Sequence, residues 1–352
     1  MDIHQITARA RKINWINNVY DFLRLRRDSR HSIRVYGTSP SKELFNEIKE
    51  AHRVYGWSPN EYFLYHYHDL TEEQRQSFIG DKEMSDIVKQ MNEKSAIEIL
   101  SDKWMTYQFY KSFFQREVIK SAVDDERLVE LLRKNGRLIV KPLTGSFGRG
   151  IQIINATDNC EETVKQLYLE YPKGFIAEEL IEQDERMAIL HPESVNTLRV
   201  NTISYNGKVI VFHSCIRTGR GKNCVDNVGS GGIGTSCDPM TGEILTAVDE
   251  YGHSFINHPD NGVPLVGYKV PCWNEALELS KKLALHIPGL HYAGWDLALT
   301  KNGWVLVEGN PRAQLGFQCT EQKGFREEMA DILRELNVDV PDVMFKKGRK
   351  TY

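Results

Sequence analysis

Residues 294–312 read GWDLALTKNGWVLVEGNPR, two apolar segments joined at a turn, which is the pattern of a β-hairpin. Three polar side chains interrupt the apolar pattern, those of Asp296, Glu308 and Asn310. Alternate residues of a strand face the same side of a sheet, so the register of the hairpin decides which of these side chains meet. The geometry of the turn therefore decides what this stretch can bind.

Two turns fit the sequence. A two-residue loop at 302–303 places Asp296 opposite Gly309 and sends Glu308 to the other side of the sheet. A three-residue loop at 301–303 places Asp296 opposite Glu308, with Asn310 on the same face. Opposed carboxylates repel each other unless a cation lies between them, and all-oxygen ligands suit Mg²⁺ or Mn²⁺ rather than zinc. This register predicts a divalent metal site at the three side chains, and the alternative is a pair of solvated acids at strand ends.

The composition is that of a folded protein with packed cores. The chain has 352 residues, of which 41% are hydrophobic and 10% aromatic, enough for two or three subdomains. Its net charge of -3 argues against a general nucleic-acid or membrane surface, and no apolar run approaches the length of a membrane span. The N-terminus lacks the apolar core of a secretory signal, and six scattered cysteines show no zinc spacing. We therefore expect a cytoplasmic protein with reduced thiols, no nucleic-acid partner and no stable membrane insertion.

The chain divides into a helical beginning and a mixed remainder. Residues 1–100 are polar and carry helix-like periodicity, which predicts a helical N-terminal region. From residue 101 onward, strands alternate with helices and turns, and residues 341–352 form a basic tail. The sequence does not predict the oligomeric state or the role of the N-terminal region.

Two lysines occupy positions where a cation needs an anionic partner. Residues 101–114 predict a helix capped by Ser101 or Asp102, and Lys103 lies in its first turn, where the helix dipole disfavours a cation. Lys141 interrupts the apolar strand RLIVKP, and buried lysines are rare unless they are paired. Phosphate would suit both ammonium groups. A solvated side chain is the alternative reading for Lys103.

A glycine-rich segment, TGSFGRG at 144–150, separates this strand from the next. Its small residues and free backbone N–H groups are suited to wrapping phosphates closely. It is not a Walker loop, because no Gly-Lys-Ser/Thr follows and no helix begins there. A flexible hairpin tip is the alternative. A second cluster, GSGGIG at 229–234, matches G-x-G-x-x-G by letter but precedes a turn and a strand, which excludes the dinucleotide-binding motif.

Arg199 and Arg217 lie on a predicted hairpin that turns at Asn206-Gly207. Their neighbours are apolar, and an unpaired guanidinium group in such surroundings is costly. Each arginine therefore needs an anion, which is either a substrate or an Asp or Glu side chain.

The motifs DK, IVKP, EEL, SVNTLR, VDNVGSGG, GWDLAL and VEGNPR resemble those of the ATP-grasp superfamily, and most of all its sugar-transfer-associated group. The resemblance covers about residues 101–320. It implies an α+β fold in which two subdomains clasp a nucleotide, here preceded by the helical region. We expect the small subdomain at 101–180 and the C-terminal subdomain, with the metal site, at 181–340.

The resemblance also implies roles for single residues. Lys103 and Lys141 would hold the phosphates of ATP, beneath the glycine loop. Arg217, with Arg199, would stabilise charge on the transferred phosphoryl group, which Asn227 would help to position. The adenine hinge would use backbone atoms of EEL, the ribose would meet Glu185 or Asp184, and Mg²⁺ or Mn²⁺ would bind the three hairpin side chains. The further nucleotide contacts implied are Gly145, Ser146, Gly148, Gly150, Glu178, Glu179, Leu180 and Glu185.

ATP-grasp ligases phosphorylate a carboxylate with ATP, and an amine or thiol then attacks the acyl phosphate. The resemblance thus implies an ATP-dependent carboxylate–amine ligase acting on small molecules, such as a sugar acid or amino acid in surface polysaccharide or related metabolite synthesis. A small-molecule phosphotransferase and a non-catalytic nucleotide-binding protein are the alternatives. Most ATP-grasp enzymes carry an α/β domain where this chain has helices, so the family does not identify the substrate.

Overall fold

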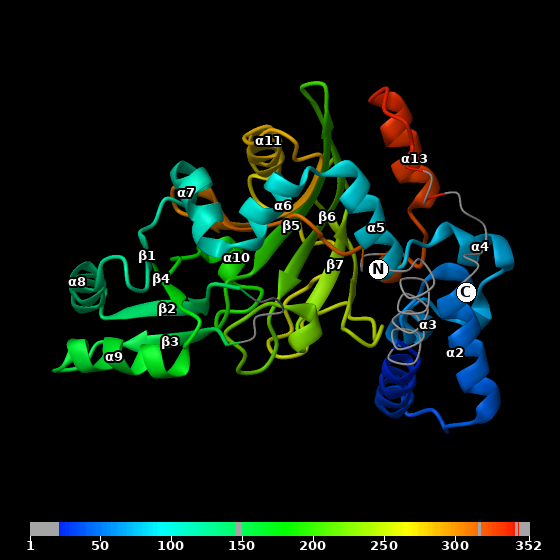
Figure 1. The fold of residues 1–352 in the computed structure, drawn as a ribbon, viewed down its shortest axis with the longest axis horizontal. Coiled ribbons are helices and arrows are strands. Elements are labelled where there is room, and N and C mark those ends of the chain that lie inside the picture. Colours follow the sequence, from blue (N-terminus) through cyan, green and yellow to red (C-terminus); the bar gives the residue numbers. More distant parts are fainter. Residues whose placement is uncertain (1–20, 145–149, 316–317, 342–343, 345–352) are drawn as a thin grey trace, which may run out of the picture.

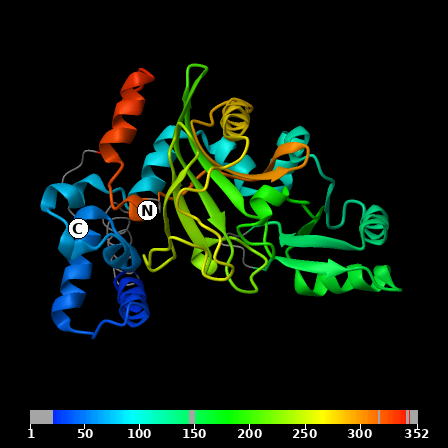
Figure 2. The same ribbon diagram turned by 180° about the vertical axis from the view of Figure 1, so that it is seen from behind.

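Two antiparallel sheets organise the chain (Figure 1). The computed structural model describes residues 21–144, 150–315, 318–341 and 344. The smaller sheet has the strand order β1-β4-β2-β3, and the larger has the order β10-β9-β5-β6-β7-β8. The N-terminal helices and the smaller sheet lie at opposite ends of the molecule, with the larger sheet between them, as Figure 2 shows from behind. No helix of the described residues is long and apolar enough to cross a membrane.

The N-terminal region is helical, as the sequence predicts. Residues 21–35 are helical, and α2 (Lys42–Tyr55), α3 (Pro59–Leu64), the short 3₁₀ helix η1 (Tyr67–Asp69), α4 (Glu72–Ser77), α5 (Asp81–Met91) and α6 (Lys94–Ser101) follow. Helix α3 begins with a reciprocal cap, because Ser58 Oγ accepts the Glu61 N–H while Glu61 Oε2 accepts the Ser58 N–H. Buried aromatic residues such as Trp57 pack this region against Val248 and Cys319 of the larger lobe. The helices are therefore packed against the larger lobe.

The smaller lobe has one face covered by helices and one face open. It contains β1 (Val118–Lys120), α8 (Asp125–Asn135), β2 (Arg137–Pro142), β3 (Gln152–Asn155), α9 (Cys160–Glu170) and β4 (Phe175–Glu179). Helix α7 (Lys103–Phe114) precedes these elements, but its buried residues Tyr107, Tyr110 and Phe114 belong to the core of the larger lobe. Leu138 and Val140 of β2 pack into a core with residues of α8 and α9. Because side chains alternate along a strand, Ile139 and Lys141 point the other way and line a cavity.

The larger lobe carries its main helix on one face of the sheet. It contains α10 (Glu185–Ala188), β5 (Thr197–Tyr205), β6 (Lys208–Thr218), the 3₁₀ helix η2 (Val228–Ser230), β7 (Ile233–Cys237), β8 (Ile244–Val248), α11 (Trp273–Ala284), β9 (Tyr292–Thr300), β10 (Gly303–Asn310), α12 (Gln318–Glu321) and α13 (Arg326–Glu335). Leu198 and Leu297 belong to one hydrophobic core with Leu283 of α11. Arg199 and Asp296, next to them in the sequence, point to the opposite face, which forms the site.

The two hairpins of the larger sheet differ in how well the sequence predicts them. The β5–β6 turn is at Asn206 and Gly207, both with positive φ, and Tyr205 pairs with Lys208, which confirms the prediction. In the β9–β10 hairpin Thr300 pairs with Gly303, so the loop is the two residues 301–302. This loop is neither of the two that the sequence favours.

A β-bulge then changes the register of β10. Leu306 pairs with Leu297, but Glu308 pairs with Asp296, so Val307 is an extra residue. Val305 and Val307 line the cavity before the bulge, and Glu308 and Asn310 line it afterwards. The extra residue therefore brings Asp296 and Glu308 opposite each other, the pairing that a three-residue loop would also have produced.

Candidate active site

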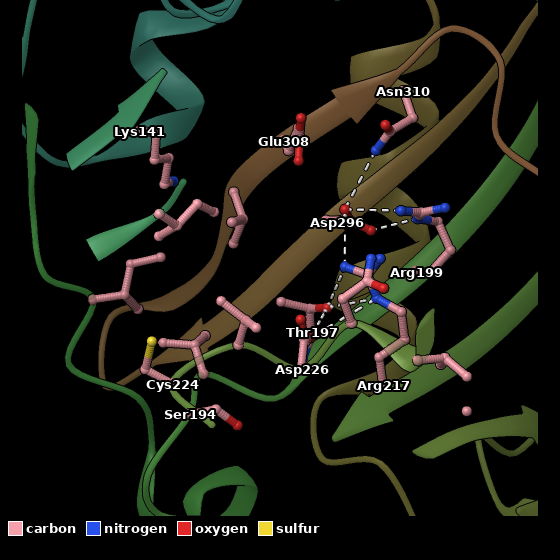
Figure 3. A pocket seen from close by; sticks show the side chains of 18 of the residues that line it. Lys141, Ser194, Thr197, Arg199, Arg217, Cys224, Asp226, Asp296, Glu308 and Asn310 are labelled. Atoms are coloured by element: carbon pink, nitrogen blue, oxygen red, sulfur yellow. Dashed lines mark hydrogen bonds and ion pairs between the residues drawn. The ribbon is translucent and has the colours of Figure 1, made fainter. Parts of the chain in front are cut away.

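A cavity of about 1610 Å³ unites residues from the smaller sheet, the larger sheet and the helical region. Lys141 of β2, Glu308 of β10 and Asn60 of α3 all line it. Figure 3 shows Lys141 and Glu308 on different elements around this space, and Asp296, Arg199 and Arg217 gathered together on the larger sheet. The volume exceeds the roughly 300–1,000 Å³ of an ordinary small-molecule pocket, so it can hold more than one substrate.

Lys141 is part of a buried three-charge cluster. Its Nζ lies 2.8 Å from Glu178 Oε1, and Arg116 donates to Glu178 Oε2 through Nε (2.9 Å) and Nη2 (2.7 Å). Burial alone would raise the pKa of Glu178, but the two cations outweigh it and lower that pKa to about 2. The cluster therefore carries one net positive charge at neutral pH, next to the cavity.

Asp296 anchors a second cluster. Arg199 binds it in a bidentate manner, with Nη2 2.9 Å from Oδ2, and Arg217 Nη2 lies 2.9 Å from the same oxygen. Burial would raise the pKa of Asp296, but the two guanidinium groups overcome this effect and lower it. The two arginines, which the sequence shows to need an anion, thus share a protein carboxylate.

Asp226 and Thr197 complete this cluster (Figure 3). Thr197 Oγ1 accepts from Arg217 Nη2 at 2.8 Å, and both its N–H and its hydroxyl donate to Asp226 Oδ2. Arg217 Nε lies 3.8 Å from Asp226 Oδ2. Burial raises the pKa of Asp226, with Arg217 opposing the effect. Arg217 is therefore held between two acids.

Glu308 and Lys103 meet at the edge of the cavity. Lys103 is the first residue of α7, whose cap is Asp102, and its Nζ lies 3.6 Å from Glu308 Oε1. The Lys103 side chain is 14% exposed and that of Glu308 40% exposed, so both groups can reach a ligand. Lys103 and Lys141 approach the cavity from different elements, which is the arrangement that phosphate groups between them would need.

The predicted metal ligands fit a divalent cation in part. Asn310 Nδ2 donates to Asp296 Oδ2 at 3.3 Å, which leaves the Asn310 carbonyl oxygen as an acceptor. Both Asp296 oxygens already accept from guanidinium groups. In the described ranges no group of three or more His, Cys, Asp or Glu side chains could hold a metal. Glu308 and Asn310 suit an ion that is also bound by phosphates, whereas Asp296 could join only if an arginine moved away from it.

The glycine-rich segment that was predicted to bind the phosphates is described only in part. Gly145, Ser146 and Gly148 lie outside the described residues. Gly150 has a positive φ and accepts a hydrogen bond from Tyr171, but it is not among the residues that line the cavity.

The EEL segment lines the cavity, but its two acids have protein partners. The Glu178 side chain is committed to the charge cluster, and Glu179 Oε2 accepts the Glu117 N–H at 2.8 Å. The Glu179 N–H donates to the Glu117 carbonyl, and Leu180 follows the end of β4, so the adenine hinge at this segment stays a prediction.

The predicted ribose contact stays a prediction. Glu185 is exposed at the start of α10 and is not among the residues that line the cavity. Asp184 is paired with Arg186. Glu182, two residues before Asp184, does line the cavity.

Asn227 lines the cavity, and its carbonyl oxygen accepts the N–H groups of Ser230 and Gly232. Sequence reasoning did not identify Arg116, Asp226 or Thr197. Asp226 precedes Asn227 in the motif VDN, which offered a signal, whereas Arg116 lies in an unremarkable polar stretch.

The sequence profile of the sugar-transfer-associated ATP-grasp family matches residues 82–334. The match spans more than half of the chain, and the chain belongs to this family. A search among curated proteins finds no significant match.

Solved structures of other ATP-grasp enzymes are similar at a distance. N5-carboxyaminoimidazole synthase from Aspergillus clavatus, in complex with ADP and 5-aminoimidazole ribonucleotide, has a TM-score of 0.44 and 13% identity, over 76% of this chain and 60% of its own. D-alanyl-alanine synthetase A from Vibrio cholerae has a TM-score of 0.41 and 11% identity, over 70% of this chain and 65% of its own. The biotin carboxylase domain of Hydrogenobacter thermophilus 2-oxoglutarate carboxylase, with MgADP and bicarbonate, has a TM-score of 0.39 and 16% identity, over 63% of this chain and 42% of its own. The chain spans less than two thirds of each of these proteins, and likeness of this degree is no guide to its reaction.

Proposed function

We propose that this ATP-grasp protein is an ATP-dependent carboxylate–amine ligase. The observation that carries the proposal is the convergence of Lys103, Lys141 and Glu308 on one cavity, from three different elements. A cation about 4 Å from a phosphate charge contributes roughly 4 kcal/mol at an effective dielectric constant of 20. Two lysines facing the same space therefore favour a ligand with several phosphate charges, such as ATP.

The rest of the nucleotide has matching surroundings. Ile139, Ile153, Leu180 and Val305 give the cavity an apolar part of its lining, which would suit a flat base. Glu182 also lines the cavity, and its carboxylate would accept hydrogen bonds from a ribose. We place Mg²⁺ or Mn²⁺ at Glu308 and Asn310, where it would neutralise phosphate charge and polarise the transferred phosphoryl group.

The proposed ligase reaction has two steps. A carboxylate oxygen of the first substrate attacks the γ-phosphorus of ATP, the bond to ADP breaks, and an acyl phosphate forms. An amine then attacks the acyl carbon, phosphate leaves, and the amine nitrogen loses a proton, which completes an amide. Arg217 is the residue best placed to stabilise the transferring group, because its Nη1 has no partner among the described residues while Nε and Nη2 are held by protein oxygens. Arg199 instead gives Nε and Nη2 to Asp296 and fixes it.

Another part of the lining suits the second substrate. Asn60 and Tyr65 of the helical region line the cavity together with Gln314 and Thr320. The helical region therefore takes the part in substrate binding that an α/β domain takes in most ATP-grasp enzymes. Because the family is associated with sugar transfer, we propose a sugar acid or amino acid as the carboxylate, in surface polysaccharide or related metabolite synthesis in the cytoplasm, where ATP is made.

The test is a panel of sugar acids and amino acids, each assayed for ADP and phosphate release with and without amines. A ligase releases phosphate with both a carboxylate and an amine present, and oxygen-18 from the carboxylate appears in that phosphate. Release of ADP without phosphate would show a phosphotransferase. Absence of any ATP binding would overturn the proposal.

A further inference from the structure

Arg116 connects the two sheets that enclose the proposed nucleotide site. It lies between α7 and β1, and its side chain is 5% exposed. In addition to its two bonds to Glu178 of β4, Nη1 donates to the carbonyl oxygens of Leu306 (2.7 Å) and Phe114 (3.2 Å). Nη2 also lies 3.5 Å from the carbonyl oxygen of Val307. The guanidinium group is thus committed to protein acceptors, and direct contact with a substrate is not its role.

The first consequence is electrostatic. Glu178 presents one oxygen to Arg116 and the other to Lys141. With both cations present the cluster carries one positive charge. Without Arg116, Glu178 would neutralise Lys141, and a phosphate in the cavity would meet a neutral pair. Arg116 therefore leaves the charge of Lys141 available for a ligand.

The second consequence is geometric. Leu306 and Val307 are the residues at which β10 changes register, and Glu308 follows directly. Arg116 occupies the carbonyl groups at this bulge, where the regular ladder is interrupted and backbone groups lack strand partners. The same side chain thus holds Lys141 through Glu178 and Glu308 through the bulge.

We propose that Arg116 is a positioning residue that offsets the charge of Glu178, so that the charge of Lys141 faces the nucleotide, and that keeps Glu308 directed at the cavity. This inference rests on the proposed function for its effect on nucleotides. The tie between the sheets is a property of the chain that can be measured without any ligand.

Four variants test it: Arg116→Gln, Arg116→Lys, the double variant Arg116→Gln/Glu178→Gln, and Arg133→Gln as a control. Arg133 makes an exposed ion pair with Glu161 in the same lobe and does not line the cavity. Calorimetry with ADP in the absence of divalent cations measures the charge effect. Hydrogen exchange of peptides covering 303–310 measures how firmly Arg116 holds β10 to the smaller sheet.

Arg116→Gln is expected to weaken ADP binding at least tenfold and to speed exchange in β10 at least fivefold. The double variant should recover most of the lost affinity, because removing the Glu178 charge frees Lys141 again, whereas a purely structural role of Arg116 predicts a further loss. Arg116→Lys keeps the charge and should bind ADP within about threefold of the unmodified protein; it also serves if Arg116→Gln does not fold. Arg133→Gln should change neither measurement.

Unchanged exchange in β10, or a double variant that binds no better than Arg116→Gln, would overturn the inference. If the unmodified protein does not bind ADP, the proposed function fails, while the exchange measurement still decides whether Arg116 ties the sheets.

Discussion

Asp296 and Glu308 face each other across β9 and β10 because Val307 is inserted as an extra residue. Without the bulge, the register set by the 301–302 loop would place Val307 opposite Asp296 and turn Glu308 to the other face. Instead Glu308 reaches the cavity beside Lys103, while Asp296 holds two arginines. The two acids thus share a face but have different partners, and they should respond differently to substitution.

Asp296→Asn is expected to lower the free energy of unfolding by about 3–5 kcal/mol, because it leaves buried guanidinium groups without their carboxylate. Urea unfolding measures the change. Glu161→Gln, which breaks an exposed pair with Arg133, is the matched control and should leave stability unchanged. Equal stability of Asp296→Asn and the unmodified protein would contradict the cluster.

Glu308→Gln should spare the fold, since the side chain is 40% exposed, but impair metal use. We expect at least a tenfold increase in the Mg²⁺ concentration needed for half-maximal ATP turnover. Titration of Mg²⁺ at fixed ATP measures it, with the exposed Glu335→Gln as control. An unchanged requirement would remove Glu308 from the proposed metal site.

Lys141→Met should abolish ATP turnover while the circular dichroism spectrum stays that of the unmodified protein, because the cavity loses a cation that its phosphates need. ADP release is the assay. Lys281→Met, on the exposed surface of α11, should keep full turnover. Near-normal activity of Lys141→Met would count against the whole site assignment.

Glu178 should make stability depend on acidic pH. Its pKa is about 2 in the folded protein and about 4.5 in the unfolded chain, so the unfolded state takes up the proton first as the pH falls. A stabilisation of roughly 3 kcal/mol is therefore present above pH 4.5 and lost between pH 4.5 and 2. Unfolding free energies measured across this range should have a shallower slope in Glu178→Gln, and an unaltered slope would refute the assignment.

Glu61 should give the free energy of unfolding the opposite dependence on pH. Burial, followed by the charge of Asp81, raises its folded pKa from 4.5 to about 8. The folded state keeps a proton that the unfolded chain releases, so its contribution is complete below pH 4.5 and declines as the pH rises to 8. Glu61→Gln should flatten the loss of stability between pH 5 and pH 8, and the exposed Glu98→Gln should not. The same decline in both variants would exclude Glu61 as its source.

Much of the fold follows from local patterns in the sequence. Helix α7, the hairpin turn at Asn206 and the helical character of the N-terminal region agree with periodicity, caps and turn residues. Each motif of the ATP-grasp group is a short run of residues that can be recognised from the sequence, and the family match confirms the resemblance. These features depend on residues near one another, where propensity and pattern act directly.

The site depended on long-range geometry that no local pattern contains. The sequence shows that Arg199 and Arg217 each need an anion, but only the packed sheet gives both of them to Asp296. It gives two possible loops for the β9–β10 hairpin, but the folded chain uses a third together with a bulge. The pairing of Glu178 with Arg116 could not be predicted from the sequence either, because the two residues are 62 positions apart in the chain. The sequence by itself determined which charged groups are present and that they lie on strands. Tertiary structure decided which of these charges pair. The physical reason is that burial makes an ion pair between distant segments obligatory but does not specify the partner.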